Sequence, residues 1–151
     1  MTENRVVTAS RDIAAPAAAI FELIADPARQ PEWDGNDNLA VSAPGQRVTA
    51  VGDVFVTTLT NGQDRANRVV EFEEGRAISW RPSPVGGAEP GHQWGWRLDP
   101  ADDGTTRVTH LYDWTELTDE DRLVRARATT ADKLQASLDN LARVAESSSA
   151  S

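Results

Sequence analysis

Apolar and polar residues alternate with a period of two in several stretches of the chain. This pattern predicts β-strands, because successive side chains of a strand point to opposite faces of a sheet. The stretches are residues 5–13, 54–59, 65–74, 76–82, 92–98 and 108–114. Turn formers lie between some of them, such as Asn61-Gly62 and Glu74-Gly75. We therefore expect neighbouring strands to pair as antiparallel hairpins.

Two short helices are predicted after the first strand. Apolar residues spaced by three and four positions run from Ala17 to Ile24, and Asp26-Pro27 then ends the stripe. A second short helix is expected over about residues 27–34, where it carries Trp33.

The chain is expected to close with one long helix over about residues 119–146, with Thr118 as its N-cap. Residues 147–151, rich in Ser and Ala, are expected to form a flexible tail. Helices that bracket a run of antiparallel strands indicate the α+β class, with one layer of helices on one face of the sheet.

Ring-bearing residues gather on one face of the hairpin formed by residues 92–98 and 108–114. If the hairpin closes symmetrically, Trp96 lies opposite His110, Trp94 opposite Tyr112 and His92 opposite Trp114. These six residues are His92, Trp94, Trp96, His110, Tyr112 and Trp114. A surface that is apolar in bulk but carries polar ring atoms is typical of a pocket for an organic ligand. The alternative is that the rings simply fill a small core.

Arg127 falls on the apolar stripe of the predicted long helix, almost in line with Leu134. A guanidinium among apolar side chains is costly unless it is paired or reaches water. Its stem could lie on the apolar surface while its head extends to solvent. Alternatively, it projects into a cavity and meets an anionic or carbonyl group of a ligand.

Composition excludes several function classes. The 151 residues suffice for one domain, and a formal net charge of −9 disfavours binding to nucleic acids and to anionic membranes. The chain has no Cys and two His, which argues against disulfides, thiolate chemistry and a dedicated metal site, and no pattern indicates a cofactor. Without a leader or a long apolar run, we expect a cytoplasmic protein without membrane insertion, either monomer or homodimer.

Several segments carry a family resemblance. They are Ser10–Pro16, Ile20–Pro27, Pro31–Asp34, Arg68–Phe72, Ile78–Arg81 and Gly104–Thr109. Over about residues 5–145 the chain resembles the polyketide cyclase/dehydrase-like family of the START/Bet v 1-like (SRPBCC) superfamily. This resemblance implies a single helix-grip domain over residues 1–146, in which a curved antiparallel sheet wraps around the long C-terminal helix and encloses a hydrophobic cavity. The family has no universal catalytic motif, so the resemblance transfers no catalytic residue.

The leading hypothesis is the binding of a small hydrophobic or aromatic molecule, lipid-like or polyketide-like, in that cavity. A cyclase, aromatase or dehydratase would use the same cavity, with His110 or Tyr112 transferring protons and Arg127 stabilising an enolate. A co-chaperone-like interaction module is a further alternative. A carbohydrate-binding face would require the indoles to be open to solvent.

Overall fold

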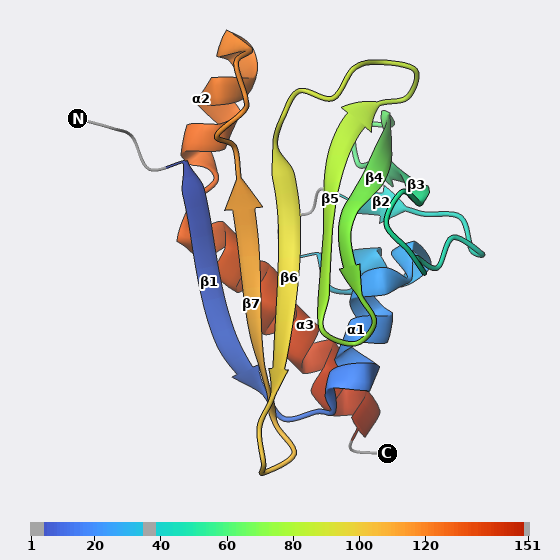
Figure 1. Cartoon of the computed structure of the whole chain (residues 1–151), viewed down its shortest axis with the longest axis vertical. Coiled ribbons are helices and arrows are strands. Elements are labelled where there is room, and N and C mark those ends of the chain that lie inside the picture. Colours follow the sequence, from blue (N-terminus) through green and yellow to red (C-terminus); the bar gives the residue numbers. More distant parts are fainter. Residues whose placement is uncertain (1–4, 35–38, 150–151) are drawn as a thin grey trace.

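The computed structural model describes residues 5–34 and 39–149, which form one seven-stranded antiparallel sheet with helices (Figure 1). The strands are β1 (Val6–Ile13), β2 (Leu39–Val41), β3 (Val54–Leu59), β4 (Asp64–Glu73), β5 (Ala77–Pro84), β6 (Gln93–Pro100) and β7 (Thr106–Asp113). Their order across the sheet is β1-β7-β6-β5-β4-β3-β2, so the first and last strands of the chain pair with each other.

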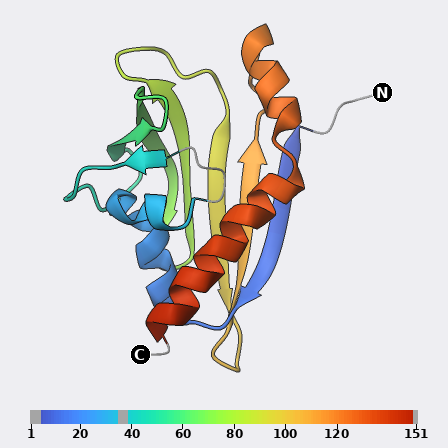
Figure 2. The same cartoon turned by 180° about the vertical axis from the view of Figure 1, so that it is seen from behind.

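The helices lie on one face of this sheet. They are α1 (Ala17–Ala25), the 3-10 helix η1 (Pro27–Glu32), α2 (Glu120–Ala128) and α3 (Ala131–Ser149). Figure 2 shows α3 crossing the face of the sheet diagonally, with α1 beside its C-terminal end and α2 continuing from its N-terminal end. The α+β class and the curved antiparallel sheet with a C-terminal helix are thereby confirmed.

The C-terminal helix differs from the expectation, because it is two helices rather than one over residues 119–146. The helical hydrogen bonding stops at Thr129, whose hydroxyl donates to the carbonyl oxygen of Arg125 at 2.9 Å. Two consecutive β-branched threonines favour such a break, since they lose side-chain freedom in a helix and offer the backbone a competing hydrogen bond. After the break, α3 continues past residue 146 to Ser149, so the expected tail begins in helical conformation. Residues 150–151 lie outside the described residues.

The N-cap of α2 is also displaced by one residue from the expected Thr118. The carboxylate of Asp119 accepts from the backbone N–H groups of Asp121 at 3.0 Å and Arg122 at 3.2 Å. Asp and Thr are both good N-cap residues, and in this structure the helix begins at Glu120, so Asp119 is the N-cap. The short strand β2 was not predicted, because three residues are too few to show an alternation.

Buried apolar side chains form two clusters. The larger one joins the sheet to α1 and to the C-terminal half of α3, and it includes Ile78, Leu98, Leu138 and Leu141. The smaller one lies around α2 and the start of α3 and is built from Tyr112, Trp114, Leu117, Leu123, Ala126 and Leu134.

None of the helices formed by residues 5–34 and 39–149 has the length and apolar character needed to cross a membrane.

Candidate functional site

The aromatic hairpin has the predicted register. Trp94 pairs with Tyr112 and Trp96 pairs with His110 across β6 and β7. The paired ladder begins at Gln93 and Asp113, so His92 lies just outside it and does not pair with Trp114 as expected.

The rings of this hairpin form a continuous array. The imidazole of His110 stacks on Trp96, with ring centroids 3.7 Å apart, and lies 5.6 Å from the ring of Trp94. Trp94 in turn lies 4.3 Å from the ring of Tyr112. Trp33, which follows η1, packs edge-on against Trp96 at 5.1 Å. These contacts hold the flat faces in fixed positions on the helix-covered side of the sheet.

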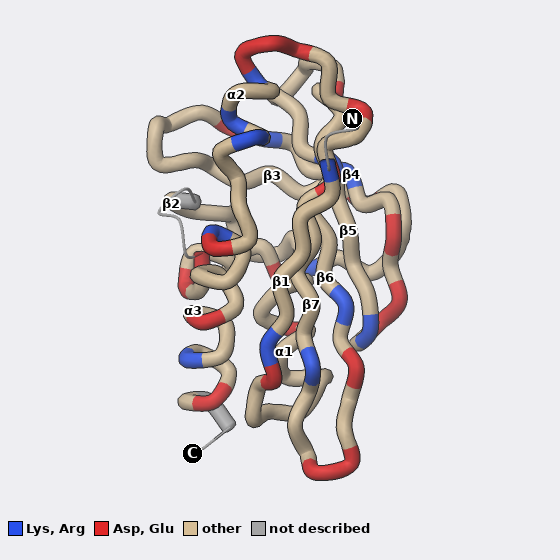
Figure 3. Tube along the Cα trace, turned by 90° about the vertical axis from the view of Figure 1, so that its left-hand side faces the viewer, with Lys and Arg blue, Asp and Glu red and all other residues tan. Residues whose placement is uncertain are grey.

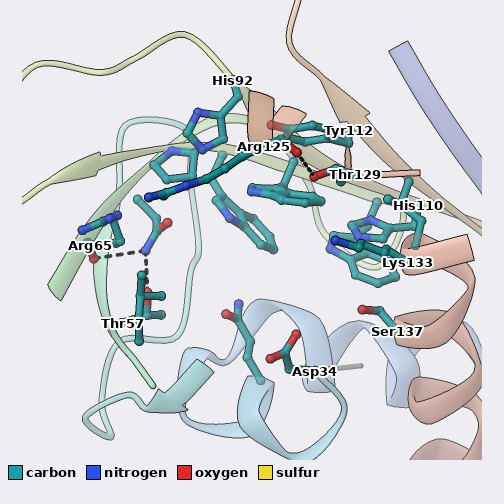
Figure 4. A pocket seen from close by; sticks show the side chains of 18 of the residues that line it. Asp34, Thr57, Arg65, His92, His110, Tyr112, Arg125, Thr129, Lys133 and Ser137 are labelled. Atoms are coloured by element: carbon teal, nitrogen blue, oxygen red, sulfur yellow. Dashed lines mark hydrogen bonds between the residues drawn. The ribbon is translucent and has the colours of Figure 1, made fainter. Parts of the chain in front are cut away.

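The array borders a pocket of about 440 Å³. The pocket lies between the sheet and the segments η1, α2 and α3 (Figure 4). Its lining residues are Gln30, Trp33, Asp34, Thr57, Leu59, Arg65, Asn67, Trp80, Pro82, His92, Trp94, Trp96, His110, Tyr112, Leu117, Arg122, Arg125, Ala128, Thr129, Lys133, Leu134 and Ser137. Five of the seven site residues predicted from the sequence are therefore brought together in one wall.

Buried polar side chains form part of the pocket lining. The amide of Asn67 donates to the hydroxyl oxygen of Thr57 and to the carbonyl oxygen of Phe55, both at 3.2 Å. The amide of Gln30 donates to the carbonyl oxygen of Ile24 at 3.0 Å. These bonds fix each amide nitrogen and orient the two side chains, whose oxygens can accept a hydrogen bond from a ligand hydroxyl.

His110 is a neutral imidazole of known tautomer. Its Nδ1–H donates to the carbonyl oxygen of Gly95 at 2.9 Å, since a carbonyl only accepts. Burial lowers the pKa of His110 to about 4, and the hydrogen bond to Gly95 opposes this only in part. At neutral pH, Nε2 therefore carries no proton and is a hydrogen-bond acceptor.

The other titratable rings of the pocket are also uncharged at neutral pH. Burial, together with the charges of Arg122 and Arg65, lowers the pKa of His92 to about 4. Burial raises the pKa of Tyr112 to about 12, although Arg122 acts in the opposite direction. The aromatic wall thus offers polar atoms but no charge.

Gly91 fixes the approach of the chain to His92. Its φ is +117°, and a Cβ at this position would lie 2.6 Å from the carbonyl oxygen of Glu116. Only glycine fits this close contact between the β5–β6 and β7–α2 connections without displacing the backbone.

Trp114 and Arg127 lie outside the pocket lining. Arg127 is exposed, and its guanidinium carbon is 5.9 Å from the centroid of the Trp114 ring. The break after α2 removes the shared helical phase that would have placed Arg127 in line with Leu134. The structure therefore shows the alternative in which the guanidinium extends outward over apolar surface, rather than into a cavity.

The structure adds lining residues that the sequence reasoning missed. The buried ones are Gln30, Thr57, Asn67 and Ser137, and the cationic ones are Arg65, Arg122, Arg125 and Lys133. Alternation in the strand predicted over residues 65–74 could have identified Asn67, because it shares a face with Val69. No local pattern brings Arg65 to Arg122, since only the tertiary fold does so.

Two indole nitrogens are buried without a hydrogen-bond partner among the described residues, those of Trp96 and Trp114. By contrast, Nε1 of Trp33 donates to the carbonyl oxygen of Leu23 at 2.8 Å. An unmade bond of this kind costs about 1–3 kcal/mol. The aromatic wall therefore sacrifices some stability.

No cluster of three or more His, Cys, Asp or Glu side chains suited to a metal ion occurs within residues 5–34 and 39–149. A metal-free site stays a prediction.

Comparison with protein families gives one extensive match. A family model described as polyketide cyclase / dehydrase and lipid transport matches residues 4–146. The chain is also 29% identical over 111 residues to the uncharacterized protein Rv0088 of Mycobacterium tuberculosis, a match that covers 72% of this chain and 47% of that protein. The chain spans about half the length of the curated relatives it matches.

Solved structures share the fold. Protein NE0264 from Nitrosomonas europaea superposes with a TM-score of 0.73 at 15% identity, covering 100% of both chains. DynU16, a putative protein in the dynemicin biosynthetic locus, gives 0.68 at 20% identity, covering 97% of this chain and 49% of its own. The Aha1 dimer from Colwellia psychrerythraea gives 0.65 at 17% identity, covering 93% of this chain and 96% of the other.

Proposed function

Because the chain belongs to the polyketide cyclase / dehydrase and lipid transport family, we propose that its pocket binds a small hydrophobic or aromatic molecule. The observation that carries this proposal is the pocket of about 440 Å³ beside the stacked rings of β6 and β7. This volume falls within the range of roughly 300–1,000 Å³ that is common for small-molecule sites.

The lining suits a flat or chain-like apolar ligand with a few polar substituents. Trp94 and Tyr112 offer ring faces and edges, and such aromatic contacts contribute about 0.5–1.5 kcal/mol each beyond burial. The amide nitrogens of Asn67 and Gln30 are already engaged, so their side-chain oxygens are the atoms that can accept a hydrogen bond from a ligand hydroxyl. Binding removes the apolar surface of such a ligand from water, and this burial is the main source of its affinity.

The pocket supports binding better than it supports acid–base chemistry. His110 hydrogen-bonds to a backbone carbonyl and not to a carboxylate, and its pKa of about 4 makes it a weak base at neutral pH. Arg127, the candidate enolate stabiliser, lies outside the pocket. A cyclase or dehydratase is therefore kept as an outcome of the experiment and not as the leading function.

Calorimetric titration with a neutral polycyclic phenol, 2-naphthol, tests the proposal. Ser137→Phe places a large ring in the pocket from α3, where Ser137 is 4% exposed. We expect its affinity for 2-naphthol to fall at least about tenfold, because the ligand and the new ring compete for the same volume. The matched control is Arg143→Phe, an exposed position on the same helix, for which we expect unchanged affinity.

Amide chemical shifts provide the second readout. If 2-naphthol shifts resonances of β6 and β7 in the wild type but not in Ser137→Phe, binding is in the pocket. Equal affinity in Ser137→Phe and the wild type, with both proteins folded by circular dichroism, would contradict the proposal. Turnover of a poly-β-carbonyl chain that is lost in His110→Gln would instead favour the enzyme.

A further inference from the structure

Cationic side chains outnumber acidic ones in the lining of the pocket. The chain carries a net charge of −9 and has 15 Lys and Arg residues in all. Four of these, Arg65, Arg122, Arg125 and Lys133, line the pocket, whereas the lining has one carboxylate, that of Asp34. All four cations are at least partly exposed, and Figure 4 shows Lys133 beside His110, on the other side of the pocket from Arg65.

The three arginines come from two elements that are distant in the sequence. Arg65 lies on β4, while Arg122 and Arg125 are one helical turn apart on α2. Figure 4 shows Arg65 and Arg125 at the same end of the pocket as His92. In Figure 3, blue segments on α2 lie far from the red connection between β6 and β7 at the opposite end of the molecule.

These arginines differ from most others in the chain because they form no ion pair with any described carboxylate. Their ion-paired counterparts are Arg11, Arg29, Arg47, Arg68, Arg81, Arg97 and Arg107. Arg65 instead donates to the side-chain oxygen of Gln63 at 3.0 Å and to the carbonyl oxygen of Asp64 at 3.3 Å. Among the described residues, the positive charge of Arg65, Arg122 and Arg125 is thus not neutralised by a carboxylate within ion-pair distance.

The cations act on one another and on the aromatic wall. Desolvation and repulsion from Arg122 and Arg125 lower the pKa of Arg65. The charge of Arg122 also reaches His92 and Tyr112, favouring the uncharged form of the former and the phenolate of the latter. Like charges held together in this way are destabilising until an anion lies between them.

We propose that the pocket is selective for an organic anion, an apolar ring system or chain whose carboxylate or other oxyanion group lies among Arg65, Arg122 and Arg125. This inference rests on the proposed function, because the apolar part of the ligand occupies the same pocket. Guanidinium groups bind oxyanions through paired, charge-assisted hydrogen bonds, and three of them can surround one such group. The apolar part then extends over Trp94 toward the buried Trp96.

Ligands that share a ring but differ in charge test this inference. The series is 2-naphthoate, the neutral 2-naphthamide and the cationic 2-naphthylmethylamine, titrated by calorimetry at pH 7.5 and low ionic strength. We expect 2-naphthoate to bind at least about tenfold more tightly than 2-naphthamide, since one charge-assisted pair has that size. The cation should bind most weakly, and added salt should reduce the difference.

The variant Arg65→Gln/Arg122→Gln/Arg125→Gln identifies the groups responsible. It should abolish the preference for 2-naphthoate and leave the affinity for 2-naphthamide within about twofold, because the apolar contacts are intact. The control is Arg143→Gln, which removes one charge from an exposed position of α3 outside the pocket and should retain the preference.

The outcomes separate the two proposals. Equal binding of all three ligands, or a preference that survives in the triple variant, overturns the anion selectivity while the hydrophobic pocket stands. If none of the three ligands binds, and dodecanoate and dodecanamide also fail, both proposals are overturned. Binding of dodecanoate alone among this second pair supports both, with a chain in place of the ring.

Discussion

The two ends of the helix-covered face of the sheet are built in opposite ways. At one end, mostly aliphatic side chains of the sheet, α1 and the C-terminal half of α3 pack into the larger core cluster. At the other end, rings and buried amides border a pocket of about 440 Å³ under α2. Helix α3 crosses both ends, with Leu134 and Ser137 beside the pocket and Leu138 and Leu141 in the packed core.

The difference shows how residue type sets packing. Branched aliphatic side chains interdigitate and fill space to the density of organic crystals. Stacked rings are rigid, and amides that must keep hydrogen bonds cannot rotate to fill a gap. Trp96 lies at the boundary, where it contacts Trp33 on one side and His110 on the other.

The largest expected effect is on stability in the packed end. Leu138→Ala removes a fully buried side chain and should cost about 4 kcal/mol, in the upper part of the range for such changes. Leu134→Ala, one turn earlier and 1% exposed, should cost about 2 kcal/mol because the pocket already borders it. Urea unfolding measures both. Equal losses would mean that the two ends are packed alike.

Acid should destabilise the protein through the pocket end. In the folded chain the pKa of His110 is about 4, against an ordinary value of 6.5, so the unfolded chain binds more protons between these values. Stability therefore decreases as pH falls from about 6.5 to about 4, by about 3 kcal/mol at most for this residue. The packed end contributes no histidine term, because His92 and His110, the two histidines of the chain, both line the pocket.

Urea unfolding between pH 7.5 and pH 4.5 measures this dependence. His110→Asn keeps a donor for the Gly95 carbonyl and should reduce the pH dependence to the part contributed by His92, whatever its effect on stability at pH 7.5. An unchanged slope would show that His110 is not buried as a neutral ring. The imidazole proton resonances of the folded wild type give an independent titration.

The smallest expected effect concerns the two indoles at the boundary. Trp33→Phe removes the hydrogen bond to the Leu23 carbonyl, whereas Trp96→Phe removes an N–H that has no partner among the described residues. Both changes remove similar ring area, so Trp33→Phe should be more destabilising by about 1 kcal/mol. Thermal unfolding of the pair checks this. A larger loss of stability in Trp96→Phe than in Trp33→Phe would contradict this and would mean that the Trp96 N–H donates a hydrogen bond.

The hairpin could be predicted from the sequence because two local rules act together. Alternation assigns faces, and a turn-rich connection between strands of equal length assigns the pairing of Trp94 with Tyr112 and of Trp96 with His110. The sequence therefore predicts correctly that Trp94, Trp96, His110 and Tyr112 share one surface.

The break in the C-terminal helix and the arginine cluster at the pocket could not be predicted from the pattern of apolar and polar residues. An unbroken apolar stripe predicted one C-terminal helix, but Thr129-Thr130 divides it and turns Arg127 away from the pocket. The cluster of Arg65, Arg122 and Arg125 combines residues of β4 and α2, which only the tertiary fold brings together. Family resemblance gave the architecture correctly but carried no information on either feature.

The break between α2 and α3 affects the rate at which a ligand would enter and leave the pocket. Helix α2 buries two side chains, Leu123 and Ala126, so its separation from the sheet sacrifices little apolar contact. Segments with so few buried side chains open locally at low free energy, well below global unfolding. If the pocket binds a ligand as proposed, we expect the opening of α2 to set its residence time, and hydrogen exchange should be faster in α2 than in the C-terminal half of α3.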